Sequence, residues 1–206
     1  MPKSYQTIIK EGTSEVIEKK SRFLGVACPV ATEEEAMAYL EQIRRKHYDA
    51  RHNCWAYVLG NDAKNVRASD DGEPSGTAGR PILEVIRHAE LTYTLVVVTR
   101  YFGGTLLGTG GLVRAYTQAA EEAVAAAEKK ERIQSERIIV TVDYSDSGKI
   151  QYLFSQNNVR LEGSDYAENV TIRLLCAAED TDRIIRQITE LTAARAKIET
   201  EEAGYV

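Results

Sequence analysis

The feature that most limits how this chain can fold is a short stretch with no polar interruption, Leu95-Val96-Val97-Val98-Thr99. A strand with one face in water alternates apolar and polar residues, whereas an unbroken β-branched run is typical of a strand buried on both faces. The run therefore predicts the core strand of the chain. Downstream of it, apolar residues recur at helical spacing for about five turns, at Leu112, Val113, Tyr116, Ala119, Ala120, Ala123, Val124 and Ala127.

Local signals predict the elements upstream of this strand. Apolar and alternating runs indicate strands within residues 5–10 and 15–30. Thr32-Glu33-Glu34-Glu35 has the form of a capping box and predicts the start of a helix, with Ala36, Leu40, Ile43 and His47 on one face. The remaining predicted elements are a strand over 53–60, a turn at Gly60-Asn61-Asp62 and a helix over 81–86 with Pro81 in its first turn.

The last third of the chain has its own succession of elements. It follows Lys129-Lys130-Glu131-Arg132, which is predicted to be a linker. Beyond this segment the pattern predicts a strand over 138–144, a helix over 148–157, strands over 159–165 and 170–177, a helix over 181–194 and a strand over 196–200. This β-α-β-β-α-β order is ferredoxin-like. The chain is therefore predicted to be α+β, with an N-terminal domain of residues 1–132 and a C-terminal domain of residues 133–206.

Composition limits the class of protein. With 43% hydrophobic and 28% charged residues the chain resembles ordinary globular proteins, and it lacks an apolar run of the roughly 18 residues that a membrane span requires. Its first residues carry neither an apolar segment nor a cleavage site of the secretory type, so we expect a cytoplasmic protein. The three cysteines, Cys28, Cys54 and Cys176, are far apart in the sequence and are expected to be reduced and buried.

The net charge of -5 is distributed unevenly and bears on possible partners. Residues 1–132 are neutral, with 18 Lys+Arg against 18 Asp+Glu, whereas residues 133–206 hold 8 against 13. An acidic segment is a poor general binder of nucleic acid, so any polyanion is expected to contact the first part of the chain. Arg44-Arg45-Lys46-His47 and Arg51-His52 are candidates there, although the former could equally be the solvated last turn of a helix.

A glycine-rich loop over residues 100–111, RYFGGTLLGTGG, joins the core strand to the long helix. Free backbone N–H groups in such a loop can hold an anion. Thr109 and Gly110 stand where a P-loop requires Lys and Ser or Thr, and Val113 stands at the third glycine position of a dinucleotide motif. Two interpretations remain open: a phosphate or carboxylate cradle with charge from Arg100 or Arg114, or glycines that only permit tight turns, with Thr109 as the helix N-cap.

The decapeptide DDGEPSGTAG, residues 70–79, is a second concentration of polar groups. The spacing of Asp70, Asp71 and Glu73 does not fit a calcium loop, but one or two of these carboxylates could hold magnesium. No common hydrolase motif or histidine-rich metal site is indicated, because the chain has only three histidines and lacks HExxH and GxSxG. His52-Asn53-Cys54 could place a base and a thiol on one strand face, but the local sequence supplies no third, orienting group.

These segments together resemble the IMPACT family, in particular its bacterial YigZ-type members. The resemblance rests on residues 70–79, on Val98-Thr99-Arg100-Tyr101-Phe102-Gly103-Gly104 and on residues 107–116, LGTGGLVRAY. His52-Asn53-Cys54 and Lys20-Ser21-Arg22-Phe23 resemble further motifs of that family. The resemblance implies a first domain of the ribosomal-protein/ribonuclease-PH type and a second domain similar to a ferredoxin-like domain of elongation factor G. The eukaryotic relatives are translation regulators, but this chain lacks their N-terminal RWD domain.

The resemblance and the missing catalytic set favour a non-enzymatic, translation-associated protein that binds RNA, the ribosome or a protein partner, without a cofactor. The alternative is a small enzyme acting on a phosphorylated or other anionic substrate, with magnesium. The residues expected at an anion- or nucleic-acid-binding surface are Arg51, His52, Arg80, Arg100, Gly103, Gly104, Gly108, Thr109, Gly110, Gly111 and Arg114. A polar loop expected on the same surface comprises Asp70, Asp71, Gly72, Glu73, Ser75, Gly76, Thr77 and Gly79.

Overall fold

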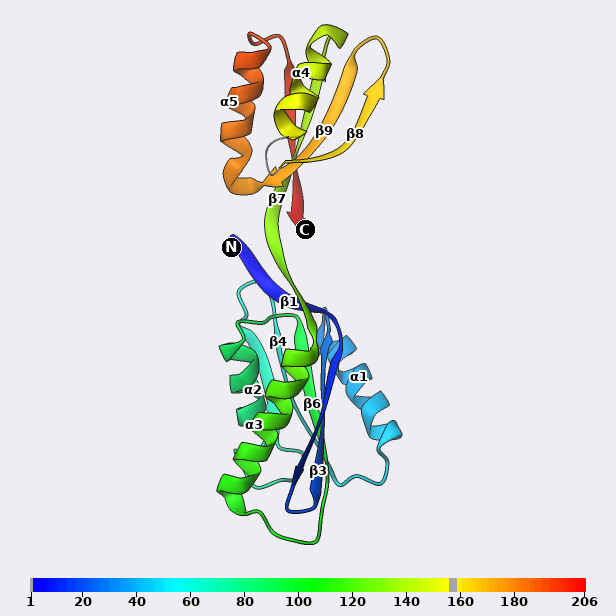
Figure 1. The fold of residues 1–206 in the computed structure, drawn as a ribbon, viewed down its shortest axis with the longest axis vertical. Coiled ribbons are helices and arrows are strands. Elements are labelled where there is room, and N and C mark those ends of the chain that lie inside the picture. Colours follow the sequence, from blue (N-terminus) through cyan, green and yellow to red (C-terminus); the bar gives the residue numbers. More distant parts are fainter. Residues whose placement is uncertain (1, 156–158) are drawn as a thin grey trace. The chain divides into compact units, whose positions relative to one another are not determined.

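The computed structural model describes residues 2–155 and 159–206, and the chain divides into two compact units, Met1–Glu131 and Arg132–Val206. The predicted α+β class is confirmed: each unit combines an antiparallel sheet with helices (Figure 1). The last residues of the helix predicted over 148–157 lie outside the described part of the chain.

The first unit is built on a sheet in which every neighbouring pair of strands is antiparallel. The strand order is β2-β3-β6-β4-β5, so the predicted core strand, β6, is central. Its residues 94–100 are all buried, which confirms burial on both faces. The strands of this unit are β1 (Ser4–Lys10), β2 (Gly12–Glu18), β3 (Ser21–Pro29), β4 (His52–Leu59), β5 (Asn65–Ser69) and β6 (Thr94–Tyr101).

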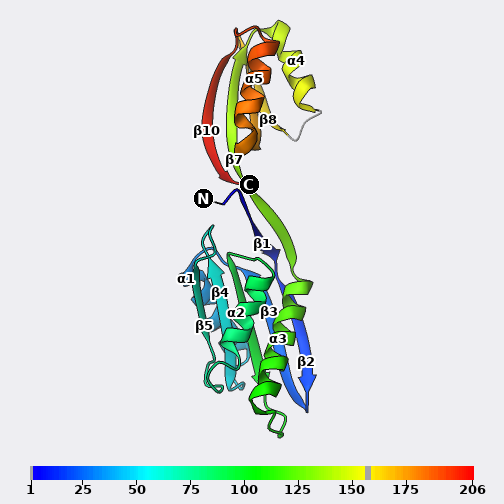
Figure 2. The ribbon, with the colours of Figure 1, turned by 90° about the vertical axis from the view of Figure 1, so that its left-hand side faces the viewer.

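Helices cover both faces of this sheet, as Figures 1 and 2 show. Helix α1 (Glu33–Lys46) packs against one face, where Leu40 joins Trp55 and Val97 in a core cluster. Helices α2 (Gly79–His88) and α3 (Gly108–Ala126) cover the other face, where Ile82 and Tyr116 join a separate cluster. Because successive side chains of a strand point to opposite faces, β6 contributes alternate residues to the two clusters.

Two helix starts were predicted from sequence, with different outcomes. The cap of α1 is confirmed: the Thr32 hydroxyl accepts a hydrogen bond from the Glu35 backbone N–H, and the Glu35 carboxylate accepts one from the Ala31 N–H. Thr109 as an N-cap is wrong, because α3 already begins at Gly108 and no side chain caps it. Val113, one member of the predicted apolar repeat on the same helix, is 36% exposed.

In the second unit the predicted β-α-β-β-α-β order is the order of the structure, and the sheet order is β10-β7-β9-β8. Its core cluster includes Ile138, Phe154, Ile172 and Ile184. The elements are β7 (Glu128–Val142), α4 (Tyr144–Ser155), β8 (Arg160–Tyr166), β9 (Val170–Ala177), a 3₁₀ turn (Ala178–Asp180), α5 (Thr181–Leu191) and β10 (Lys197–Tyr205).

The division between the two units falls within the linker predicted at residues 129–132, but this segment is part of the long strand β7 and not an irregular connection. Lys129, Lys130 and Glu131 are all exposed. A strand segment that buries no side chain shows no alternation of apolar and polar residues, so its composition is that of a linker. The other strand missed from sequence is β5, which lies at the edge of its sheet and has no fully buried residue.

The three cysteines are free and buried, as predicted. Within the described ranges, no helix has the length and apolar character needed to cross a membrane.

Candidate functional site

Strand register brings the predicted site residues to one end of the first unit's sheet, which we call the loop end. On β6, Arg100 lies opposite both Phe23 of β3 and His52 of β4. The glycine-rich loop leaves β6 one residue later, and the 70–79 loop follows β5 beside the start of β4. The glycine-rich loop lies at the lower end of this unit in Figures 1 and 2. The two loops that sequence singled out are therefore neighbours.

Asp70 fills the N-terminus of helix α2 with its own carboxylate. Oδ1 accepts hydrogen bonds from the backbone N–H groups of Ala78 (3.0 Å) and Gly79 (2.8 Å), and Oδ2 accepts one from Gly76 (2.8 Å). Burial raises the pKa of Asp70, but the three N–H donors outweigh burial and hold it below its usual value. The carboxylate is thus a structural anion, and it occupies the place at which α2 would otherwise bind one.

We expect Asp70→Asn to lower the free energy of unfolding at pH 7 by about 1–2 kcal/mol, the usual effect of losing a helix cap. A carboxyl whose pKa is lowered in the folded state stabilises above its unfolded pKa of about 3.9, and this stability is lost as the pH falls through the folded value. The difference between wild type and variant should therefore shrink below about pH 4. Urea unfolding at several pH values measures it, with exposed Ser75→Ala as the control. A difference that is constant with pH would contradict this role.

Asp71 links the 70–79 loop to strand β4 and helix α1. Its Oδ2 accepts a hydrogen bond from the Asn53 backbone N–H (2.7 Å), and its Oδ1 accepts one from Arg44 Nη2 (3.0 Å). The Asp71 carbonyl oxygen lies 2.9 Å from His52 Nδ1. Because a carbonyl can only accept, Nδ1 carries the proton in this contact. His52 is therefore engaged with the loop.

Cys54 is a poor nucleophile in this setting. Its thiol donates a hydrogen bond to the Asp70 carbonyl oxygen at 3.0 Å. Burial raises the pKa of Cys54, and nearby carboxylates raise it further. Since the thiolate is the reactive form, a raised pKa removes the reactivity that a catalytic cysteine needs. The arrangement does not support the thiol–base pair considered from sequence.

Glu73 points inward and forms the buried centre of the loop end. Its Oε1 accepts hydrogen bonds from Arg100 Nη1 and from the Tyr116 hydroxyl, both at 2.7 Å. The Glu73 and Arg100 side chains are 3% and 8% exposed. Burial raises the pKa of Tyr116, so its hydroxyl stays protonated and donates. This cluster ties the 70–79 loop to the core strand and to α3 by contacts between residues far apart in sequence.

Arg100 is enclosed by aromatic rings as well as by Glu73. Its guanidinium carbon lies 5.5 Å from the centre of the Phe23 ring and 5.6 Å from that of Phe102, within the range of cation–π contact. Its Nε atom is buried without a hydrogen-bond partner. Arg100 was predicted to contact an anion directly; in this structure it is a buried residue that supports the loops.

The glycine-rich loop packs tightly on one side and is open on the other. Gly103 donates its N–H to the Ser21 hydroxyl (3.0 Å) and lies directly against the backbone of Lys20. Gly104 and Gly108 have positive φ angles, 83° and 68°. Among the residues of its first turn, α3 has no acidic side chain, and no side chain caps its N-terminus. The first N–H groups of α3 are thus left to solvent or to a ligand.

Cations surround these loops on the surface. Lys19 and Lys20 form the β2–β3 turn, Arg51 precedes β4, Arg80 lies in the first turn of α2 and Arg114 lies in the second turn of α3. All five are exposed, and within the described part of the chain none forms a salt bridge with a carboxylate. The carboxylates of the 70–79 loop bond inward, and Glu18 beside the β2–β3 turn is exposed, so the exposed charge around the two loops is mainly positive.

The structure sorts the predicted site residues into three groups. Support residues are buried or internally bonded: Asp70, Asp71, Glu73, Thr77, Gly79, Arg100 and Gly111. His52 is half-buried against Asp71, and Gly103 is packed on Lys20. Those left exposed on the surface are Arg51, Gly72, Ser75, Gly76, Arg80, Gly104, Gly108, Thr109, Gly110 and Arg114.

The metal option for the 70–79 loop finds no geometric support. Each of its carboxylates is engaged with N–H, guanidinium or hydroxyl donors, and the described residues contain no group of three or more His, Cys, Asp and Glu side chains that could hold a metal ion. Sequence reasoning missed Lys19 and Lys20 as surface cations and Tyr116 as the partner of Glu73. Tyr116 lies at a core position of a helical repeat, where periodicity carries no sign of a polar contact.

Comparison with known proteins agrees with this domain structure. Residues 19–124 match the model of the Impact N-terminal domain, and residues 140–195 match a Domain of unknown function (DUF1949). The chain is 38% identical to the IMPACT family member YvyE of Bacillus subtilis (strain 168) over 203 residues, which cover 98% of this chain and 94% of that protein. It is 36% identical to the IMPACT family member YigZ of Escherichia coli (strain K12) over 162 residues, 78% of this chain and 79% of that protein.

A solved structure is similar over the same length. The crystal structure of a hypothetical protein aligns with a TM-score of 0.65 and 30% sequence identity, covering 98% of this chain and 100% of that one. The matched Impact N-terminal domain contains both loops of the loop end and all five of the surrounding cations. The match to the family model and the sequence identity to relatives over most of their length show that this chain belongs to the IMPACT family.

Proposed function

We propose that the protein is a non-enzymatic binding protein that contacts RNA, on its own or within the ribosome, through the loop end of its first unit. One observation carries the proposal: the carboxylates of the 70–79 loop bond inward, whereas Lys19, Lys20, Arg51, Arg80 and Arg114 are exposed without salt bridges among the described residues. A phosphate backbone binds to such a surface and releases its counterions.

Two further features of the loop end suit a nucleic acid. The free N–H groups at the start of α3 favour a negatively charged group such as phosphate. Exposed rings lie among the cations: Phe102 is 53% exposed and Tyr48 is 86% exposed. Unpaired bases stack on aromatic side chains of this kind. Single-stranded RNA is therefore the preferred probe.

The link to translation is the finer part of this proposal. It is supported by the resemblance of the first domain to the ribosomal-protein/ribonuclease-PH type and of the second to a ferredoxin-like domain of elongation factor G. The sheet order β10-β7-β9-β8 and the β-α-β-β-α-β succession are compatible with the latter. A translation-associated role is compatible with binding either to ribosomal RNA or to a protein partner.

To test this, binding of a fluorescently labelled single-stranded RNA to the full chain is measured by fluorescence anisotropy at several salt concentrations. We expect affinity to fall steeply as salt rises. Arg51→Ala with Arg114→Ala should weaken binding about tenfold and reduce the salt slope by about one for each lost phosphate contact. Arg87→Ala is the matched control, because Arg87 is an exposed arginine of the same unit that pairs with Glu84 near the other end of α2. Absence of binding at low salt, or equal losses in all variants, would overturn the proposal.

The alternative, an enzyme acting on an anionic substrate with magnesium, is less well supported. The carboxylates that would bind the metal or transfer protons are already engaged as internal acceptors. The thiol of Cys54 has a raised pKa and is buried. Turnover of a phosphorylated substrate that is abolished by Asp71→Asn, in a protein that remains folded, would favour this alternative.

A further inference from the structure

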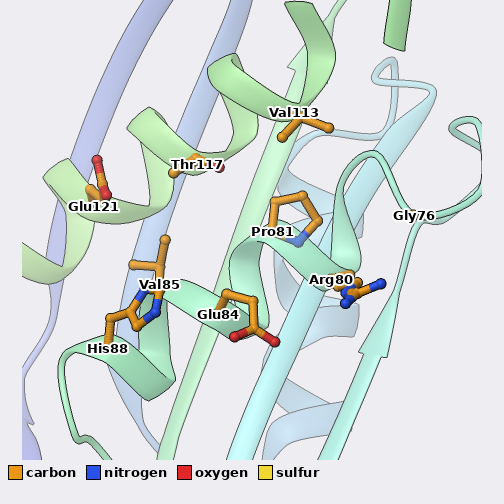
Figure 3. Close-up of a pocket in the computed structure, with 9 residues that line it drawn as sticks. All are labelled: Gly76, Arg80, Pro81, Glu84, Val85, His88, Val113, Thr117 and Glu121. Atoms are coloured by element: carbon orange, nitrogen blue, oxygen red, sulfur yellow. The ribbon is translucent and has the colours of Figure 1, made fainter. Parts of the chain in front are cut away.

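A groove of about 490 Å³ lies between helices α2 and α3 of the first unit. Arg51, the cation at the start of β4, does not line it. Figure 3 shows its walls. Arg80, Glu84 and His88 form a row on α2, and Val113, Thr117 and Glu121 form a row on α3. Residues four apart lie on one face of a helix, so each row is a straight ridge and the groove follows both helices.

The two ridges run in the same direction. Both helices begin at the loop end, α2 after the 70–79 loop and α3 after the glycine-rich loop. From residue 80 to residue 88 the groove extends about 12 Å, or two helical turns, at the helical rise of about 1.5 Å per residue. Accordingly, Arg80 and Val113 lie toward one end of the groove, and His88 and Glu121 lie toward the other (Figure 3).

The groove has an apolar middle and oppositely charged ends. Pro81, Val85 and Val113 are its apolar lining; Val85 is largely buried, whereas Val113 is 36% exposed although the other large apolar residues of its helix are buried. Arg80 at one end and Glu121 at the other are exposed, and neither forms a salt bridge within the described ranges. Glu84, between them, is paired with Arg87. An occupant therefore needs an apolar stripe, an acidic end and a basic end.

We propose that this groove is the docking site for an amphipathic helix of a protein partner, about two turns of which lie in the groove. A third helix fits between two parallel ridges in the manner of ordinary helix packing, and its apolar stripe would cover Pro81 and Val113. Its acidic first turn lies at Arg80 and its basic last turn lies at Glu121. This charge order also suits the docked helix itself, because acidic residues favour a helix N-terminus and basic residues its C-terminus.

The test selects binders of the full chain from a displayed library of helix-forming 16-residue peptides. We expect the enriched peptides to share apolar residues at positions i, i+3 or i+4, and i+7, preceded by acidic residues. One enriched peptide, synthesised with a fluorophore, is then measured by anisotropy. Thr117→Trp fills the groove and should weaken its binding at least tenfold, whereas Gln118→Trp, turned about 100° around α3, should leave it unchanged.

Reselection with Arg80→Glu tests the direction of the charges. Peptides enriched on that variant should carry basic residues in place of the acidic ones. Failure to enrich any apolar stripe, equal binding by wild type and Thr117→Trp, or an unchanged charge pattern on Arg80→Glu would each overturn the proposal. RNA binding by Thr117→Trp is measured in parallel and should be retained. The helix-docking and RNA proposals can therefore fail separately.

Discussion

Replacement of Glu73 by alanine is expected to destabilise the first unit by about 3–5 kcal/mol, the usual effect of removing one partner from a buried ion pair. The Glu73 side chain is 3% exposed and accepts hydrogen bonds from Arg100 and Tyr116. Its removal leaves the Arg100 charge, 8% exposed, without its carboxylate. It also leaves the Tyr116 hydroxyl without its acceptor, and an unsatisfied buried donor adds to the loss.

The measurement is urea unfolding followed by tryptophan fluorescence. Trp55 is the single tryptophan of the chain, is 6% exposed and belongs to the first unit, so it reports on that unit alone. Glu73→Gln keeps an acceptor for Tyr116 and should be less destabilising than alanine. Combining Glu73→Gln with Arg100→Met removes both charges and should recover part of the loss caused by Glu73→Gln alone. A loss below about 1 kcal/mol for Glu73→Ala would contradict the structural role of the cluster.

Gly103→Ala is expected to cost about 3 kcal/mol, at the upper end of what overpacking usually causes. A Cβ atom at Gly103 would lie 2.0 Å from the Lys20 carbonyl carbon and 2.3 Å from both the Lys20 oxygen and the Ser21 nitrogen. All three are backbone atoms, so no side-chain rotation relieves the clash. The glycine-rich loop must then move away from the β2–β3 turn, which carries Lys19 and Lys20.

Gly104→Ala is the matched control in the same loop. A Cβ atom at Gly104 would meet nothing within 4 Å, but φ is 83°. Alanine there should therefore lower the free energy of unfolding only by the cost of the left-handed backbone conformation, about 1–2 kcal/mol. Urea unfolding monitored through Trp55 compares the two variants. If the RNA proposal holds, Gly103→Ala should also weaken RNA binding while the protein remains folded, because it displaces the lysines of the turn. Equal stability of the two variants would mean that the close approach to Lys20 does not constrain the loop.

Much of the fold could be predicted from short-range patterns. The run Leu95–Thr99 indicated the central strand, and the apolar repeat after residue 111 indicated α3. Such predictions succeed because burial of a whole face leaves a period in the sequence. They failed where burial leaves no period: at the edge strand β5 and at the exposed first residues of β7. Val113 belongs to the apolar repeat of α3, but its side chain lines an open groove instead of the core.

The position of the candidate site could be predicted from sequence, but the roles of its charged side chains could not. Two polar loops were identified, and the structure places them side by side at the loop end. Nothing in DDGEPSGTAG indicates that Asp70 caps a helix that begins nine residues later or that Glu73 accepts hydrogen bonds from residues 27 and 43 positions away. The same carboxylates were equally compatible with a metal site, because their chemistry alone does not reveal their donors.

The sequence by itself determined the α+β class, the central strand, the long helix, the element order of the second unit and the positions of both polar loops. Periodicity and turn residues determine these features because they act over a few neighbouring positions. Only the tertiary structure decided that the carboxylates of the 70–79 loop face inward, that Arg100 is buried and that Arg51, Arg80 and Arg114 remain exposed. The physical reason is that a charged side chain takes the partner that strand register and helix packing bring to it, and these partners come from distant parts of the chain.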